Sequence, residues 1–249
     1  MTTILVTGGT GGLGSHVVPL LAQRDVDIRV LTRTPRPSVD GISFAAGDTV
    51  AGTGLAEAMT GVDVVLHLAG GPKGDDIGTQ HVVDAARDAR VRHIVMISVI
   101  GAETMPIGYF RRKGEAERIL AAGGVPWTVL RAAQFHSFAY GMVAGMARLP
   151  IVPVMKDVRL EPVAVQDVAA RLVELALGAP QGRAADLAGP EVRSLESLID
   201  ELPGKDRPHW RFGMPGAIGR AYREAANLAG ADVVRGSGTW AEYLADRAA

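Results

Sequence analysis

The stretch Thr7-Gly8-Gly9-Thr10-Gly11-Gly12-Leu13-Gly14 follows a short β-branched run and opens a segment whose apolar residues recur at helical spacing. Gly8, Gly11 and Gly14 have the spacing that lets a chain turn tightly after a strand, approach a pyrophosphate with its backbone and pack a helix against the strand. The N-terminus of that helix then faces the negative charge. The stretch therefore predicts a dinucleotide-binding loop. It is not a Walker loop, because no Lys-Ser or Lys-Thr pair follows it.

Short apolar runs alternate with helical patterns through the first half of the chain. The runs that we interpret as buried parallel strands are Ile4–Val6, Ile28–Leu31, Ile42–Phe44, Val62–Leu68, His93–Ile97 and Trp127–Leu130. A further helical pattern occupies Val168–Ala176, with Asp167 as the expected N-cap. Six βα units of this kind predict an α/β fold, a Rossmann-type doubly wound parallel sheet whose ligand lies across the carboxyl ends of the strands.

After Phe135 the pattern changes to Met, Gly, Pro and scattered aromatic residues. We therefore predict a dinucleotide-binding core over residues 1–134 and a small mixed C-terminal part over residues 135–249. The two form one compact unit, because no linker rich in Ser, Pro or charge separates them. The second part is expected to build an apolar pocket, with Phe135, His136 and Phe138 as substrate contacts; the alternative is that these Met and aromatic residues form ordinary core and that His136 has only a packing or hydrogen-bonding role. Such a pocket suits a small, flat hydrophobic substrate such as a quinone or an aromatic ketone.

The composition of the 249-residue chain excludes several classes of function. Its 26 Lys and Arg balance 27 Asp and Glu, giving a formal net charge of -1, so bulk charge predicts no nucleic-acid partner. Because the chain has no Cys, it has no disulfide, no thiolate nucleophile and no Cys-ligated metal; its six His form no close metal-ligand pair, so we expect no metal. No stretch is long and apolar enough to span a membrane. We expect a cytoplasmic monomer or homodimer.

The end of the second strand bears on the choice of cofactor. An NAD-preferring site usually places an acidic residue there for the ribose hydroxyls, whereas this chain has Arg33 after Thr32. A guanidinium at that place can pair with a 2′-phosphate and stack on adenine, which favours NADPH, with NAD as an alternative cofactor. The other interpretation is an ordinary solvated arginine. The residues expected to contact the cofactor are Gly8, Thr10, Gly11, Gly12, Leu13, Gly14, Thr32, Arg33, Asp48, Leu68, Ala69, Gly70 and Lys113.

Tyr109 and Lys113 are four residues apart, just before a helical pattern at Glu115–Leu120. On a helix this spacing leaves two side chains about 40° apart on one face. An ammonium beside a phenol favours the phenolate, as a general acid or base near neutrality requires. Ser98, at the end of the fifth strand, is placed to hydrogen-bond a substrate carbonyl. The alternative is structural, because most Tyr-Lys pairs at this spacing lie on surface helices.

The chain resembles the short-chain dehydrogenase/reductase superfamily, and within it the atypical NmrA-like branch of NAD(P)H-binding reductases. The resemblance covers nearly the whole chain. The segments that carry it are Thr7–Gly14, Asp48, His67–Gly70, Ser98, Tyr109–Glu117, Trp127–His136, Glu161–Ala169 and Gly238–Leu244. The glycine motif is specific to the superfamily, and the segments around Phe135 and Trp240 point to the branch.

This resemblance implies hydride transfer between NADPH and a carbonyl, a quinone or a conjugated double bond. Tyr109 would donate the proton, Lys113 would hold the nicotinamide ribose, and Ser98, which is slightly closer to Tyr109 than is usual, would orient the substrate oxygen. Some members of the branch are cofactor-sensing regulators, so a noncatalytic NAD(P)-sensing protein is the alternative. A sugar-nucleotide epimerase or dehydratase is a third interpretation, which Arg33 and the chain length disfavour.

Overall fold

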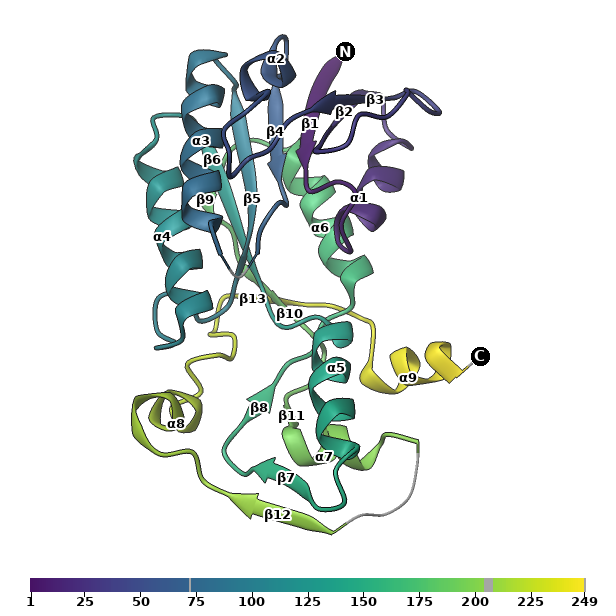
Figure 1. Cartoon of the computed structure of the whole chain (residues 1–249), viewed down its shortest axis with the longest axis vertical. Helices are drawn as coiled ribbons and strands as arrows, with labels where there is room; N and C mark the ends of the chain where they lie inside the picture. The colour runs from purple at the N-terminus through teal and green to yellow at the C-terminus, as the bar shows by residue number, and fades with distance from the viewer. Residues whose placement is uncertain (72, 204–207, 249) are drawn as a thin grey trace. The chain divides into compact units, whose positions relative to one another are not determined.

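The computed structural model describes residues 1–71, 73–203 and 208–248 (Figure 1). Its contacts group the chain into two units. The first contains Met1–Ser98, Arg111–Leu130 and Ala169–Ala184; the second contains Val99–Phe110, Arg131–Val168 and Ala185–Ala249. The chain passes from one unit to the other several times, so the division crosses strands and helices, whereas the boundary expected from the sequence was a single one after residue 134.

The first unit is built on a parallel sheet. Its strands are β1 (Thr2–Thr7), β2 (Val26–Thr32), β3 (Ile42–Ala46), β4 (Val64–His67), β5 (His93–Val99), β6 (Trp127–Ala132) and β9 (Gly182–Arg183). They lie in the order β3-β2-β1-β4-β5-β6, with β9 paired to β6. Ile4 of β1 faces Ile28 of β2 on one side and Val64 of β4 on the other. The predicted Rossmann-type sheet is confirmed, and its strand order reverses beside β1, where such sheets bind ligands.

Helices cover both sides of this sheet. They are α1 (Gly14–Leu21), α2 (Leu55–Met59), α3 (Asp75–Asp88), α4 (Gly108–Ala122) and α6 (Val165–Leu177). Figure 1 shows α3 and α4 together on one side of the sheet and α1 and α6 on the other. Buried Leu5 and Ile94 of the sheet pack in one cluster with Val82 of α3 and Leu120 of α4. This apolar burial fixes the ends of the strands, which carry the site.

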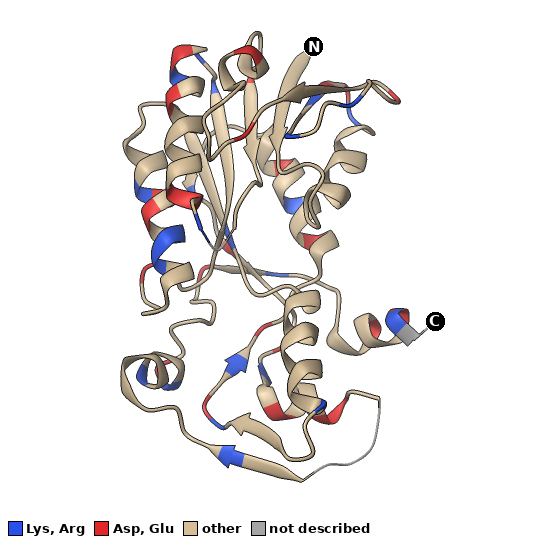
Figure 2. Ribbon diagram, viewed as in Figure 1, with Lys and Arg blue, Asp and Glu red and all other residues tan. Residues whose placement is uncertain are grey.

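Charged residues of both signs are interspersed along α3 and α4 (Figure 2). Arg87 pairs with Asp84 at 2.6 Å on α3, and Arg118 pairs with Glu115 at 2.6 Å on α4. These are exposed pairs one turn apart, of the kind that contributes little to stability. Within the described part of the chain, none of the helices has the length and apolar character needed to cross a bilayer.

The connection between β2 and β3 differs from the prediction. Residues 33–41, all of which are described, contain no helix, so one of the six expected βα units lacks its helical half. The two prolines of this segment explain the difference, because each removes a backbone donor and disfavours a helical conformation in the residue before it. The two strands still pair in parallel, from Ile28 opposite Ile42 to Thr32 opposite Ala46.

The prediction for the start of α6 was also wrong. This helix begins at Val165, so Asp167 lies inside its first turn and is not the N-cap. The Asp167 carboxylate instead accepts a hydrogen bond from the backbone N–H of Ser237 at 2.8 Å and one from Gly238 at 3.1 Å. A contact between residues so distant in the sequence leaves no local pattern from which it could be inferred.

The second unit combines short strands with helices. Its Ala132, at the end of β6, pairs with Leu187 of β10 (Asp186–Ala188), which pairs in turn with β13 (Val233–Arg235). Two small sheets pair β7 (Val152–Met155) with β12 (His209–Phe212) and β8 (Arg159–Leu160) with β11 (Arg193–Ser194). The helices are α5 (His136–Ala147), α7 (Leu195–Asp200), α8 (Gly216–Arg223) and α9 (Trp240–Ala248).

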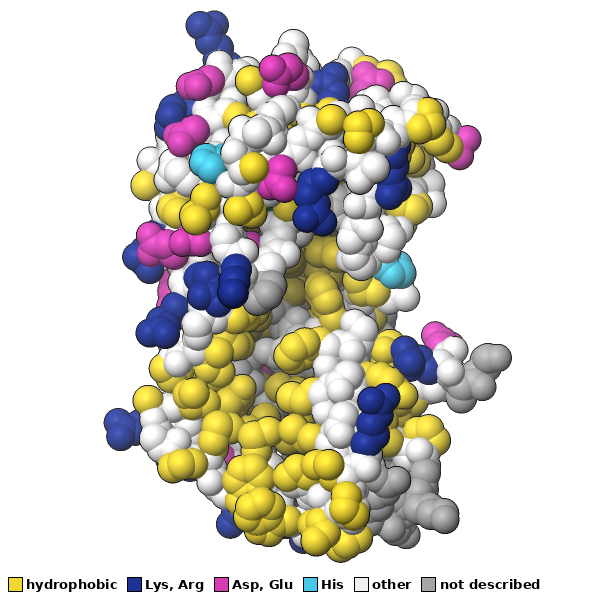
Figure 3. Space-filling view, in the orientation of Figure 1, with side chains coloured by type: hydrophobic (Ala, Val, Ile, Leu, Met, Phe, Trp, Pro, Cys, Tyr) yellow, Lys and Arg dark blue, Asp and Glu magenta, His cyan; other side chains and the backbone are white. Residues whose placement is uncertain are grey.

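This unit has its own apolar core, which includes Val143, Leu195 and Trp240. The methionines that follow Phe135 pack partly buried against it: Met142, Met146, Met155 and Met214. Hydrophobic side chains also gather on the surface of this unit around β7 and β12 (Figure 3). The exposed large hydrophobic side chains of this unit include those of Phe138, Leu149, Ile151 and Trp210. The second unit is thus apolar both inside and over part of its surface.

Candidate cofactor and active site

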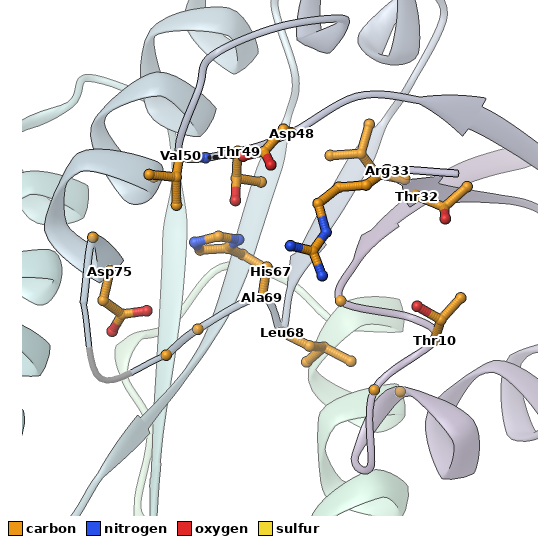
Figure 4. A pocket seen from close by; sticks show the side chains of 18 of the residues that line it. Thr10, Thr32, Arg33, Asp48, Thr49, Val50, His67, Leu68, Ala69 and Asp75 are labelled. Carbon is orange, nitrogen blue, oxygen red and sulfur yellow. Dashed lines mark hydrogen bonds between the residues drawn. The ribbon is translucent and has the colours of Figure 1, made fainter. Parts of the chain in front are cut away.

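A cavity of about 440 Å³ lies in the first unit, at the carboxyl ends of β1, β2 and β4 (Figure 4). Its walls come from the glycine-rich loop, the residues that follow β2 and β3, and the loop between β4 and α3. The predicted cofactor residues that line it are Gly8, Thr10, Gly11, Gly12, Leu13, Gly14, Thr32, Arg33, Asp48, Leu68, Ala69 and Gly70. The structure therefore brings together residues from four separate segments, as expected for a site at the end of a parallel sheet.

The glycine-rich loop packs as the spacing of its glycines predicts. Gly8 has a φ of 70°, and a Cβ there would lie 2.6 Å from the backbone nitrogen of Ala69. A Cβ on Gly14 would lie 2.3 Å from the carbonyl oxygen of Gly8, whereas one on Gly12 would meet no described atom within 4 Å. No described side chain caps the N-terminus of α1. The first turn of this helix therefore presents backbone to an open cavity, as a bound pyrophosphate requires.

Arg33 follows the last residue of β2, and Figure 4 shows its guanidinium pointing into the cavity. A second cation, Lys73, lines the same cavity from the loop after β4. Asp48 also lines the cavity, and its Oδ1 accepts the backbone N–H of Val50 at 2.8 Å and that of Ala51 at 3.0 Å. Asp48 thus holds the loop after β3 in shape, while the two cations supply the positive charge of the pocket.

His67 lines the cavity and connects the glycine-rich loop to α3. Its Nδ1 lies 2.7 Å from the hydroxyl of Thr7, which accepts the N–H of Ala69, and its Nε2 lies 3.2 Å from the hydroxyl of Thr79. Thr79 donates to the carbonyl oxygen of Asp75 at 2.7 Å, so the imidazole carries its proton on Nε2. Burial, and to a smaller extent the charge of Lys113, lowers the pKa of His67 to about 3. His67 is therefore neutral and structural.

Lys113 is not among the residues that line the cavity, but its ammonium lies close to Gly70, which does line it, and 2.9 Å from Asp75 Oδ2. The two side chains are 8% and 2% exposed, so this is a buried ion pair. Asp75 Oδ2 has no hydrogen-bond partner among the described residues, so the two charges are close together but their geometry is not that of a hydrogen bond. Lys113 also donates to the carbonyl oxygen of Ile97 at 3.4 Å. The described contacts thus leave the ammonium with donors for a ligand.

Ser98 is buried at the end of β5, and its hydroxyl donates a hydrogen bond to Oε1 of Glu117 on α4. Tyr109 also lies on α4, in the part of the helix that belongs to the second unit, one turn before Lys113. Its ring is exposed and contacts Phe110 edge to face, with the centroids 5.6 Å apart. The helical spacing expected for Tyr109 and Lys113 is present, and a chemical role for either stays a prediction.

The predicted substrate residues lie at the start of α5 in the second unit. Phe138 is exposed, whereas His136 is buried beside Tyr243 and Trp240, with ring centroids at 5.3 and 6.0 Å. Burial lowers the pKa of His136, against a hydrogen bond to the Pro162 carbonyl that raises it. His136 Nε2 has no hydrogen-bond partner among the described residues. Phe135 precedes the helix and forms its N-cap.

Sequence reasoning did not assign Asp75, Lys73, Thr79 or Glu117 to the site. Asp75 and Asp76 begin α3, where acidic residues usually stabilise the N-terminus of a helix, so their pattern gave no reason to single out one of them. The described residues contain no group of three or more His, Asp or Glu that could hold a metal ion.

Residues 8–177 match the protein family described as NAD(P)H-binding, which is more than half of the chain. The chain belongs to this NAD(P)H-binding family. The cavity at the end of its sheet has the backbone cradle and the two cations, Arg33 and Lys73, that a dinucleotide phosphate cofactor needs, so the observed residues fit NADP(H). The protein is an NAD(P)H-binding oxidoreductase.

Known relatives agree with this assignment. The chain is 34% identical to the (4-alkanoyl-5-oxo-2,5-dihydrofuran-3-yl)methyl phosphate reductase of Streptomyces griseus over 209 residues, which is 80% of this chain and 72% of the relative. It is 27% identical to quinone oxidoreductase 2 of Escherichia coli over 209 residues, 80% and 73% of the two chains. A crystal structure of the NADPH-dependent quinone oxidoreductase of Escherichia coli with NADPH has a TM-score of 0.82 at 20% identity, covers 99% of this chain and 100% of its own, and shows the shared fold.

Proposed function

We propose that this protein is an NADPH-dependent reductase of the short-chain dehydrogenase/reductase superfamily, in its atypical NmrA-like branch. It transfers hydride to a carbonyl, a quinone or a conjugated double bond of a small hydrophobic substrate. The observation that carries the proposal is the buried Lys113 ammonium close to Gly70 of the cofactor cavity, one helical turn after the exposed Tyr109. An ammonium and a phenol at that spacing suit proton donation beside a dinucleotide.

The bound cofactor supplies the hydride. Arg33 binds the 2′-phosphate, and the backbone of the glycine-rich loop binds the pyrophosphate. Lys113 donates to hydroxyls of the nicotinamide ribose. Tyr109 gives its hydroxyl proton to the reduced substrate, and Ser98 orients the substrate oxygen. Phe135, His136 and Phe138 supply contacts to an apolar substrate such as a quinone or aromatic ketone.

The relatives support the reaction class. One is named for the reduction of a phosphorylated dihydrofuran and another for the oxidoreduction of quinones. Both names describe substrates with a conjugated carbonyl system, whose two-electron reduction takes up one hydride and one proton overall. A single proton donor beside the nicotinamide therefore suffices for either substrate.

The test begins with titration of the protein by NADPH and NADH, followed by fluorescence. Oxidation of each cofactor is then measured over a panel of quinones, aromatic ketones and enones. Tyr109→Phe is compared with Tyr222→Phe, which makes the same change at a half-buried tyrosine outside the proposed site. We expect NADPH binding to survive in both variants and turnover to fall at least about a hundredfold only in Tyr109→Phe.

Two other outcomes have definite meanings. Binding without turnover across the panel would favour the noncatalytic NAD(P)-sensing alternative. Turnover that survives Tyr109→Phe would mean that another group or solvent supplies the proton, and Tyr109 would lose its role. Either result leaves the NAD(P)H-binding assignment in place, because that assignment rests on the family match and the cavity.

A further inference from the structure

Asp75 is the first residue of α3 and is one of the residues that line the cofactor cavity (Figure 4). Its side chain is 2% exposed and contacts the Lys113 ammonium, which is itself almost fully buried. A buried charge of one sign is costly unless a charge of the opposite sign is close by. Asp75 and Lys113 therefore compensate each other's buried charge.

The backbone of Asp75 is held from two directions. Gly74, with a φ of 76°, precedes it as the N-cap of α3, and the hydroxyl of Thr79 donates to its carbonyl oxygen at 2.7 Å. Thr79 is buried and is in turn bonded to His67. The carboxylate therefore extends from a fixed point of the fold, and its direction toward Lys113 is set by the start of the helix.

Gly70 provides the space in which the two charges meet. A Cβ at this position would lie 2.8 Å from Asp75 Oδ1 and 3.0 Å from Lys113 Nζ. Both charged ends thus converge on one backbone position that itself lines the cavity. The absence of a side chain at Gly70 allows the ion pair to lie directly behind this part of the cavity wall.

We infer that Asp75 is a positioning residue of the cofactor site, which holds the Lys113 ammonium against the cavity wall beside Gly70. Lys113 has few other partners there, since its described hydrogen bond to Ile97 is long at 3.4 Å. Without the carboxylate, the buried ammonium would have to move toward water, and its donors would leave the cavity wall. The inference rests on the proposed function only in that Lys113 contacts the cofactor.

The test measures NADPH dissociation constants by fluorescence, with no substrate present. Asp75→Asn keeps the shape of the side chain and removes its charge, and we expect NADPH binding about tenfold weaker. Asp76→Asn is the matched control, because it removes the same charge from the same turn of α3 at a residue outside the cavity lining. We expect less than about a twofold change for that variant.

A double-mutant cycle shows whether Asp75 acts through Lys113. In a Lys113→Met protein, adding Asp75→Asn is expected to leave NADPH binding unchanged or to improve it, because no ammonium remains to be held. A second tenfold loss in that background, or no loss from Asp75→Asn in the wild type, would overturn the inference. If Asp75→Asn alone unfolds, Lys113→Met and the double variant still decide the question, with a further loss in the double variant counting against Asp75.

These outcomes are separate from the fate of the proposed function. The cycle depends on cofactor binding alone, whereas the reductase proposal depends on turnover in the presence of an acceptor. A protein that turns over but shows an additive cycle would retain its proposed function and lose the positioning role of Asp75. A protein with the expected cycle but no turnover would retain the positioning role of Asp75 and lose its proposed function.

Discussion

The hydroxyl of Ser98 donates a hydrogen bond to Glu117, which lies one turn after Lys113 on α4. Its neighbour Ile97 accepts the long hydrogen bond from Lys113. Two consecutive residues at the end of β5 thus contact two consecutive turns of this helix within the first unit. Ser98 is buried, so the hydroxyl proposed to orient the substrate already has a protein partner.

Ser98→Ala is expected to lower the free energy of unfolding by about 1 to 2 kcal/mol, because it removes a hydrogen bond to a carboxylate. Urea denaturation measures this loss. Glu117→Gln keeps an acceptor oxygen at the same place and should cost less. If Ser98 also orients the substrate, turnover will fall further in Ser98→Ala than in Glu117→Gln, whereas equal turnover in the two variants would leave Ser98 a purely structural role.

Local patterns predicted the cofactor cavity better than the ion pair in its wall. The glycine-rich loop and Arg33 can be recognised in the sequence, because their expected function depends on spacing within a few residues and on a position next to a strand. The pairing of Asp75 with Lys113 joins two helices that are distant in the sequence, and nothing local distinguishes Asp75 from Asp76. Such a contact is determined by how α3 and α4 pack on the sheet.

The part of the chain after Phe135 was harder to predict, because its structure also depends on contacts between residues that are distant in the sequence. Its strands are two to four residues long, so alternation has too few positions to be recognised. Asp167 looked like a helix cap because Asp often is one, yet its partner Ser237 lies 70 residues away. The class of fold could be predicted from the alternation of strands and helices in the first half alone. The prediction holds although the connection between β2 and β3 contains no helix.

Arg33→Ala is expected to weaken NADPH binding about 10- to 100-fold, because a charge-assisted hydrogen bond to a phosphate contributes about 1.5 to 3 kcal/mol. NADH has no 2′-phosphate, so its affinity should change less than about twofold. Fluorescence titration with both cofactors measures the two effects. Arg36→Ala is the matched control, since Arg36 is an exposed arginine of the same segment that does not line the cavity. Equal losses for NADPH and NADH would place Arg33 elsewhere than at the 2′-phosphate.

Two glycines of the same loop are expected to separate folding from binding. Gly14→Ala should lower the free energy of unfolding by about 2 kcal/mol, because its Cβ would press on the Gly8 carbonyl at 2.3 Å. Gly12→Ala should cost less than about 0.5 kcal/mol, since no described atom lies within 4 Å of that Cβ. It would place a methyl group in the cavity, and NADPH binding should weaken about tenfold. Stability losses of the same size in both variants would contradict this division.

His67 gives the protein a specific sensitivity to acid. Because its pKa is lowered to about 3 in the folded protein and is ordinarily 6.5, the unfolded chain binds an extra proton between these values. The contribution of neutral His67 to stability is therefore complete above about pH 6.5 and is lost as the pH falls toward 3, by about 2 kcal/mol at pH 5. Urea denaturation at about pH 7.5 and about pH 5 measures the change for the wild type and for His67→Gln.

The wild type is expected to lose about 2 kcal/mol more than His67→Gln between the two pH values. Burial also lowers the pKa of His93 and His136, but both remain in the variant, so the difference between the two proteins isolates His67. The same loss in both would mean that His67 is not held neutral in the folded protein. NADPH that binds the folded state should raise the free energy of unfolding of both proteins at either pH.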